Sequence, residues 1–125
     1  ISVISTKQYF KILERGINTV MENEMVTYKT INITDARDLI KTGKVILADI
    51  RDRESYMQAH IPDAVHLTED NLEEFKKNTD PDELIIMYCY HGNNSVGAAQ
   101  HFANMGYRNV YSLDGGFSEY SKHKF

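Results

Sequence analysis

The hydrophobic residues of this chain are gathered in short runs, separated by polar and amphipathic segments. Five runs have the length and composition of β-strands, at residues 29–33, 45–48, 64–67, 84–88 and 109–113. The runs at 45–48 and 84–88 are almost continuously apolar, which is typical of strands that are buried on both faces. Polar segments long enough to hold helices separate the runs, as in proteins built on a parallel sheet.

The segments between these runs predict the helices. Thr34 is expected to cap a helix over residues 35–41, and Gly43 follows the end of that helix. Thr68 is expected to cap another helix, with Asn71 three residues further on. The other predicted helices span residues 53–58, 95–105 and 117–122.

The alternation of strands and helices predicts an α/β fold with a central, mostly parallel five-stranded sheet and helices on both faces. Ligands of such sheets bind at the carboxyl ends of the strands. Cys89 and the segment 49–52 both follow strand ends, so we expect them at the same edge of the sheet. This domain is predicted to span residues 26–125. Residues 1–25 carry a separate pattern, in which Thr6 caps a peripheral N-terminal helix.

Composition and charge exclude several kinds of function. The chain has 125 residues, of which 42% are hydrophobic, and this suits one domain with a single core. It has 14 Lys+Arg against 18 Asp+Glu and no basic run, so a nucleic-acid surface is not expected. No apolar run approaches the roughly 20 residues that span a membrane. The single cysteine cannot form an internal disulfide, and a reduced, cytoplasmic setting is expected.

Cys89 is the residue most informative about chemistry. It follows the apolar run at 84–88, and the loop after it lacks large aliphatic residues: Tyr90, His91, Gly92, Asn93, Asn94 and Ser95. Loop N–H groups and the start of the next helix favour negative charge, so they can stabilise a thiolate and lower the pKa of the thiol. We therefore expect a nucleophile, in contrast to the inert, buried role of most lone cysteines.

Other uses of a cysteine fit the sequence less well. A thioredoxin-like site needs a second cysteine where Gly92 stands, and a zinc site needs more ligands, so no metal or cofactor is expected. A cysteine protease needs a histidine base beside the thiol. His91 lies within the loop and His101 on the following predicted helix, and neither position predicts such a base. A cysteine phosphatase needs an arginine six residues after the cysteine, where Ser95 stands, and residues 89–99 contain no arginine or lysine.

Four stretches share the order and spacing of a known family. They are residues 89–100 around Cys89, Ala-Asp-Ile-Arg-Asp at 48–52, His-Ile-Pro-Asp-Ala and His-Leu-Thr within 60–68, and the segment 106–117 with its Asp-Gly-Gly-Phe end. Together they resemble single-domain rhodaneses, and most of all the bacterial GlpE type. The resemblance covers residues 29–122 and implies a rhodanese-like fold.

The resemblance also implies a thiosulfate sulfurtransferase. Cys89 would attack the outer sulfur of thiosulfate, expel sulfite and carry a persulfide. Cyanide, or a dithiol protein such as thioredoxin, would then collect that sulfur. Tyr90 to Ser95 would hold the persulfide through their N–H groups, whereas Arg51 and Asp52 would belong to a structural, ion-paired turn.

The sequence departs from the family pattern at Asn94, where many rhodaneses have arginine and the GlpE type has serine. Because the loop carries no cation, we expect weak thiosulfate binding or another sulfur donor. Two alternatives stay open. One is a persulfide carrier that a partner protein loads, and the other is a non-catalytic rhodanese-like interaction domain that uses residues 1–25.

Overall fold

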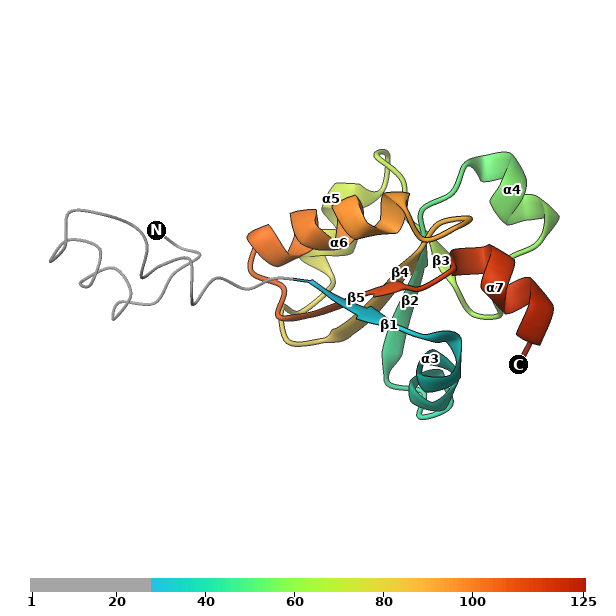
Figure 1. The fold of residues 1–125 in the computed structure, drawn as a ribbon. Helices are drawn as coiled ribbons and strands as arrows, with labels where there is room; N and C mark the ends of the chain where they lie inside the picture. The colour runs from blue at the N-terminus through green and yellow to red at the C-terminus, as the bar shows by residue number, and fades with distance from the viewer. Residues whose placement is uncertain (1–27) are drawn as a thin grey trace, which may run out of the picture.

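The structure, a computed structural model, describes residues 28–125, and the helix predicted within residues 1–25 lies outside this range. The fold is built on a five-stranded sheet in the order β1-β5-β4-β2-β3 (Figure 1). All strand pairs are parallel, so the predicted mostly parallel sheet is entirely parallel. The strands are β1 (Lys29–Ile31), β2 (Val45–Asp49), β3 (Val65–His66), β4 (Leu84–Tyr88) and β5 (Asn109–Leu113).

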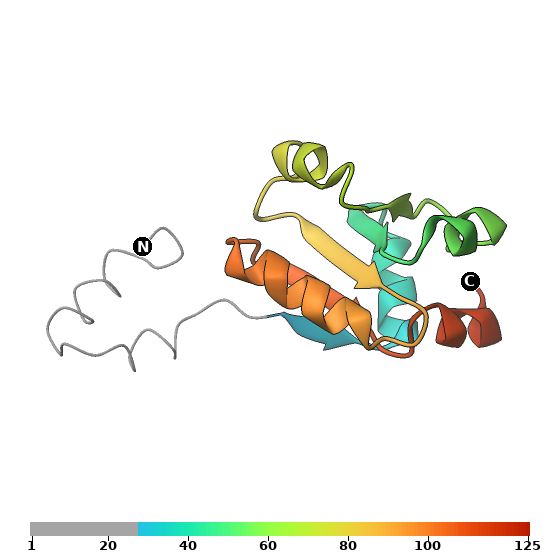
Figure 2. The same ribbon diagram turned by 90° about the horizontal axis from the view of Figure 1, so that it is seen from above.

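Helices cover both faces of the sheet, as the alternating pattern predicts. They are α3 (Ile33–Ile40), α4 (Arg53–Gln58), α5 (Leu72–Lys77), α6 (Asn94–Asn104) and α7 (Gly116–His123). Figures 1 and 2 show α5 and α6 on one face of the sheet and α3 on the other. The core has two parts accordingly: Phe102 of α6 packs on one face, while Ala36 of α3 and Tyr120 of α7 pack on the other.

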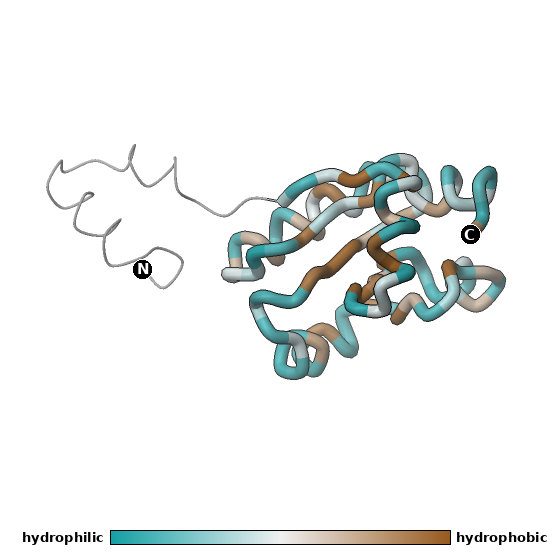
Figure 3. The backbone as a smooth tube through the Cα atoms, turned by 90° about the horizontal axis from the view of Figure 1, so that it is seen from below, coloured by the Kyte–Doolittle hydropathy of each residue, from teal (hydrophilic) through white to brown (hydrophobic). Residues whose placement is uncertain are grey.

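The central strand β4 joins the two parts of the core. Ile86 and Tyr88 belong to one cluster and Ile85 and Met87 to the other, because successive side chains of a strand point to opposite faces. All four side chains are 0% exposed. Figure 3 accordingly shows hydrophobic residues along most of this strand. Burial of β4 on both faces therefore explains the continuous apolar run in the sequence, as predicted.

Two predicted helix caps are wrong. Asn32, and not Thr34, caps α3, and its side chain accepts a hydrogen bond from the Asp35 N–H at 2.7 Å. β1 ends at Ile31, earlier than predicted, because Asn32 already turns the chain into the helix. The helix α5 begins at Leu72 after Asn71, so the cap predicted at Thr68 is also wrong.

The side chain of Asn71 explains the later start of α5. It accepts a hydrogen bond from the Thr68 N–H at 2.8 Å and donates one to the carbonyl of His66 at 2.7 Å. These two bonds hold a turn between β3 and the helix, in the place where the sequence pattern predicts the first helical residues. The predicted bounds of the remaining helices differ from the structure by at most one residue at each end.

The sheet order brings the ends of β2 and β4 together. The two strands are neighbours, and Asp49 is in register with Tyr88. Beyond the last pair, the Ile50 N–H donates to the Tyr88 carbonyl at 3.0 Å. The segment after β2 therefore lies beside Cys89 at the carboxyl edge of the sheet, where parallel sheets bind ligands.

Candidate active site

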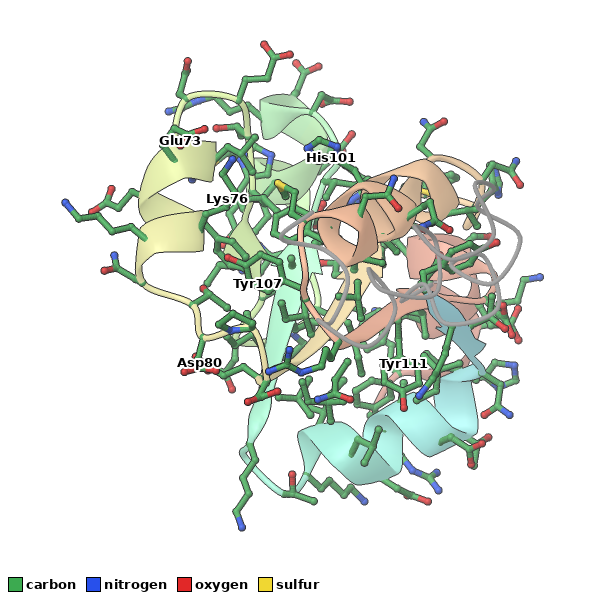
Figure 4. All side chains as sticks on the ribbon, turned by 90° about the vertical axis from the view of Figure 1, so that its left-hand side faces the viewer. Glu73, Lys76, Asp80, His101, Tyr107 and Tyr111 are labelled. Atoms are coloured by element: carbon green, nitrogen blue, oxygen red, sulfur yellow. The ribbon has the colours of Figure 1, made fainter. Side chains whose placement is uncertain are left out.

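Cys89 lies directly after β4 and is 5% exposed. Its side chain forms part of the wall of a pocket of about 430 Å³ at the carboxyl edge of the sheet. The pocket is lined by Ile50, Arg51, Asp52, Ser55, Cys89, Tyr90 and Asn94. A larger depression of about 750 Å³ lies over α5, and its lining residues include no cysteine, serine or histidine. Glu73 and Lys76 of this lining are labelled in Figure 4. The chemistry of the site therefore points to the smaller pocket.

Backbone and hydroxyl groups of the loop converge on the sulfur. The Gly92 N–H donates to Cys89 Sγ at 3.1 Å, and the Ser95 N–H donates at 3.3 Å. The Ser95 hydroxyl lies 3.5 Å from the same sulfur, where it accepts from the thiol or donates to the thiolate. Neutral donors alone make these contacts, so the loop forms an anion cradle without a cation.

These contacts lower the pKa of the Cys89 thiol. Burial acts in the opposite direction, because a thiolate loses hydration inside the protein. Hydrogen bonds from the Ser95 hydroxyl and N–H, from the Gly92 N–H and, least, from the Asn94 N–H outweigh that cost, and the net pKa lies below the ordinary value. The thiol is thereby converted to its nucleophilic form at lower pH.

The side chains of the other loop residues have different surroundings. Tyr90 is 52% exposed, and its ring packs edge-on against His91 with 4.5 Å between the ring centroids. Asn93 precedes α6 without a side-chain capping bond, and Asn94 forms part of the pocket wall. Of the six loop residues that the sequence singles out, Gly92 and Ser95 therefore donate to the sulfur at 3.1 Å and 3.3 Å, and the Asn94 N–H makes the weakest contribution to the lowered pKa.

The start of α7 holds the loop in shape from behind. The Phe117 N–H donates to the Cys89 carbonyl, and the Ser118 N–H donates to the Tyr90 carbonyl, both at 2.9 Å. A Cβ atom on Gly116 would lie 2.8 Å from the Tyr90 carbonyl oxygen, so only glycine lets the helix approach this closely. With these carbonyls turned toward α7, the following N–H groups can turn toward the sulfur.

Asp49 and Arg51 form a buried ion pair at the edge of the site. Their side chains are 0% and 6% exposed, and an Arg51 nitrogen lies 2.7 Å from an Asp49 oxygen. The same guanidinium donates to the Ala59 carbonyl at 2.6 Å and lies 4.0 Å from the Phe117 ring centroid. Arg51 thus links β2 with the end of α4 and with α7, which is the arrangement expected of a structural clamp.

Comparison with known proteins agrees with this geometry. Residues 32–123 match the model of the family described as rhodanese-like domain. The chain belongs to the rhodanese-like family. It is 40% identical over 96 residues to a protein of Coxiella burnetii named thiosulfate sulfurtransferase GlpE, and the match covers 77% of this chain and 90% of the relative.

Solved structures share the rhodanese-like fold at lower identity. The human single-domain sulfurtransferase TSTD1 is 21% identical with a TM-score of 0.69, and the match covers 77% of this chain and 97% of that one. A rhodanese-related protein of Thermoplasma volcanium is 23% identical with a TM-score of 0.66, covering 78% and 95% of the two chains. At these identities the likeness concerns the fold.

The histidines of this rhodanese-like domain have structural partners. Tyr56 is stacked between His60 and His66, with ring centroids 3.9 Å and 4.7 Å away. His60 Nδ1 contacts the Tyr56 carbonyl, and His66 Nε2 contacts the Arg51 carbonyl at 2.6 Å. His101 lies along α6 (Figure 4). No hydrogen bond within residues 28–125 joins a histidine to the sulfur, so the geometry gives no cysteine–histidine pair.

Within the described residues, no group of three or more His, Cys, Asp or Glu side chains could hold a metal ion. Nor does any helix between residues 28 and 125 combine the length and the apolar character needed to cross a bilayer.

Two features of the site were not predicted from the sequence. One is the role of Gly116 and the first N–H groups of α7, for which the Gly115-Gly116 pair at the end of β5 was the available signal. The other is Ser112, whose hydroxyl oxygen lies 2.8 Å from the hydroxyl oxygen of Ser95. A serine inside an apolar strand is a weak signal, because its partner belongs to a segment distant in sequence.

Proposed function

We propose that this protein is a thiosulfate sulfurtransferase and that Cys89 is its nucleophile. The observation that supports this most directly is the set of loop donors on the Cys89 sulfur, from Gly92 and Ser95. A thiolate held by neutral donors remains nucleophilic, and the same donors can stabilise an anionic product. The named relative of Coxiella burnetii supports the same chemistry.

In the first half-reaction, the Cys89 thiolate attacks the outer sulfur of thiosulfate. A bond forms between Sγ and that sulfur, the S–S bond of thiosulfate breaks, and sulfite leaves with the bonding electron pair. The protein then carries a persulfide whose terminal sulfur is anionic. The pocket of about 430 Å³ has room for the small donor, and the loop donors lie beside the charge that moves.

In the second half-reaction, another nucleophile takes the terminal sulfur and regenerates the Cys89 thiolate. Cyanide does so with formation of thiocyanate, and a dithiol protein such as thioredoxin does so with formation of hydrogen sulfide and its own disulfide. The exchange follows two separate steps, so ping-pong kinetics are expected. A free thiol and dithiol acceptors persist in a reducing compartment, and we propose a cytoplasmic site of action.

Intact-mass measurement of the protein after incubation with thiosulfate tests this proposal. The wild type is expected to gain the mass of one sulfur atom, to lose it on treatment with cyanide and to produce thiocyanate. The Cys89→Ser variant, which keeps the size of the side chain, is expected to do neither. Failure of the wild type to gain sulfur and to turn over thiosulfate with cyanide would contradict the proposal.

A second candidate, a persulfide carrier, is favoured by the charge of the pocket. Arg51 is the cation among the described lining residues, and Asp49 neutralises it. Hydrogen bonds from the Ser55 N–H and hydroxyl lower the pKa of Asp52, so a carboxylate also faces the pocket. Thiosulfate is a dianion, and such a pocket gives it little electrostatic attraction.

Competing sulfur donors distinguish the two candidates. A carrier is expected to accept sulfur rapidly from a protein-bound persulfide and to react negligibly with thiosulfate. A sulfurtransferase of the proposed kind turns over thiosulfate at a rate that rises with its concentration. Both reactions are followed by the mass of the Cys89 persulfide, so they can be compared in the same preparation.

A further inference from the structure

A buried pair of serines lies behind the Cys89 sulfur. Ser95 is in the first turn of α6 and Ser112 is in β5, and their side chains are 0% and 1% exposed. Their hydroxyl oxygens are 2.8 Å apart, and Ser95 Oγ lies 3.5 Å from Cys89 Sγ. The Ser95 hydroxyl therefore lies within hydrogen-bond distance of both the Ser112 hydroxyl and the Cys89 sulfur.

The direction of the hydrogen bond between the serines decides what Ser95 can do. Each hydroxyl has one proton. If Ser95 gives its proton to Ser112, it cannot donate to the sulfur. If Ser112 donates to Ser95, the Ser95 proton is available for the thiolate. A buried hydroxyl proton needs an acceptor, and Ser95 Oγ lies at hydrogen-bond distance from Ser112.

The position of Ser112 is fixed by the sheet. β5 pairs with β4, and Ser112 is in register with Met87, whose side chain is 0% exposed. The hydroxyl of Ser112 is therefore held on a rigid element, whereas Ser95 belongs to the beginning of a helix after a loop. A donor on a strand can fix the rotation of a hydroxyl on such a segment.

We propose that Ser112 is a positioning residue, which donates to Ser95 Oγ and thereby directs the Ser95 hydroxyl proton toward the Cys89 thiolate. This inference rests on the proposed function of Cys89 as the nucleophile. Accepting a hydrogen bond also makes Ser95 a stronger donor. Ser112 acts through Ser95 alone, and its effect is therefore lost when the Ser95 hydroxyl is removed.

The pH dependence of Cys89 alkylation by iodoacetamide tests the proposal without relying on sulfur transfer. Ser112→Ala is expected to move the midpoint of this profile upward by about 0.3–0.5 pH unit. Ser95→Ala removes the direct donor and is expected to move it upward by about 1–2 pH units. The double variant is expected to have the profile of Ser95→Ala. A shift in Ser112→Ala that reappears in the Ser95→Ala background would contradict the relay.

Two further variants separate positioning from a loss of stability. Val110→Ala removes buried volume from the same face of β5, and it is expected to lower the free energy of unfolding without moving the alkylation profile. Ser112→Thr keeps the hydroxyl and is expected to keep the wild-type profile. An unshifted profile in a folded Ser112→Ala protein would overturn the proposal. If Ser112→Ala does not fold, a wild-type profile in Ser95→Ala overturns it, because the relay then has no effect to transmit.

The alkylation experiment also separates this proposal from the proposed sulfur transfer. If the profiles shift as expected and no persulfide forms, the relay stands and the sulfurtransferase assignment fails. If a persulfide forms and the Ser112→Ala profile does not shift, the sulfurtransferase assignment stands and the relay fails.

Discussion

The two connections that flank β4 use their backbone N–H groups in different ways. In the turn before the strand, carboxylates of the turn accept these hydrogen bonds: the Asp82 N–H donates to the Asp80 side chain, and the Asp80 N–H donates to the Glu83 side chain, both at 2.9 Å. The loop after the strand instead aims the N–H groups of Gly92 and Ser95 at the Cys89 sulfur.

Distant elements bind the carbonyls of both connections. In the turn at residues 80–83, the Arg108 N–H donates to the Pro81 carbonyl at 2.9 Å, and the Asn109 side chain donates to the Asp82 carbonyl at 2.8 Å. The loop at residues 89–95 needs α7, whose first N–H groups bind its carbonyls, and β5, which contributes Ser112. The two connections therefore differ in their N–H groups: those of the turn bind carboxylates of the turn itself, whereas those of the loop remain available to the sulfur.

Gly116→Ala is expected to have the largest effect on the loop after β4. The added Cβ would lie 2.8 Å from the Tyr90 carbonyl oxygen, so α7 or the loop must move. We expect the free energy of unfolding to fall by about 2–4 kcal/mol. Persulfide formation is expected to slow by roughly 100-fold, because small displacements at a reacting centre are costly. Chemical denaturation and the mass of the persulfide measure these effects.

Gly43→Ala is the matched control for that variant. Both glycines have a positive φ, +55° at Gly116 and +75° at Gly43, but a Cβ added to Gly43 would meet no atom within 4 Å. We expect a loss of only about 1–2 kcal/mol in the free energy of unfolding, from the left-handed backbone alone. The rate of persulfide formation is expected to stay at the wild-type value. An equal loss of rate in both variants would mean that α7 has no special role.

Asn94→Arg adds to the loop after β4 the cation that this loop lacks. Asn94 lies in the pocket wall beside Cys89, and its side chain is exposed, so a longer side chain can be accommodated. The guanidinium is expected to raise kcat/KM for thiosulfate by about tenfold at low salt, through attraction of the dianion. Added salt should reduce this gain. Asn94→Gln, which lengthens the side chain without charge, should show no gain.

Asp82→Asn tests the turn before β4 and has the smallest expected effect. It weakens the ion pair between Asp82 and Arg108, 2.6 Å apart, whose side chains are 67% and 57% exposed. The free energy of unfolding is expected to change by less than about 1 kcal/mol, because exposed ion pairs are screened by water. The alkylation profile of Cys89 should not move. A shift would show that the two connections are coupled through β4.

The sequence was sufficient to predict those features that depend on local chemistry. The apolar run of β4 and the thiol beside a helix start both follow from neighbouring residues. The alternation of elements likewise predicts helices on both faces. The residues before the first helical turns were harder to predict, because each of these segments offers two candidates. Asn32 and Asn71 hold these positions in place of Thr34 and Thr68. Which candidate is used depends on where the preceding strand ends.

The remaining features of the site depend on contacts between distant segments. Ser112 follows Ser95 by 17 residues, and its hydroxyl acquires a partner only when β5 lies beside β4. The contact of Gly116 with the Tyr90 carbonyl likewise requires that α7 pack behind the loop. No periodicity or local propensity records such contacts, so they could be found only in the folded structure.

The pH dependence of Cys89 alkylation, measured at low and at high salt, tests the central claim most directly. A cradle of neutral hydrogen-bond donors is expected to place the midpoint below the value of about 8.5 for an ordinary cysteine. Because the donors carry no net charge, that midpoint should move little with salt. A midpoint at or above the ordinary value would contradict the account. So would one that rises steeply with salt, because fixed cations would then be the source of the reactivity.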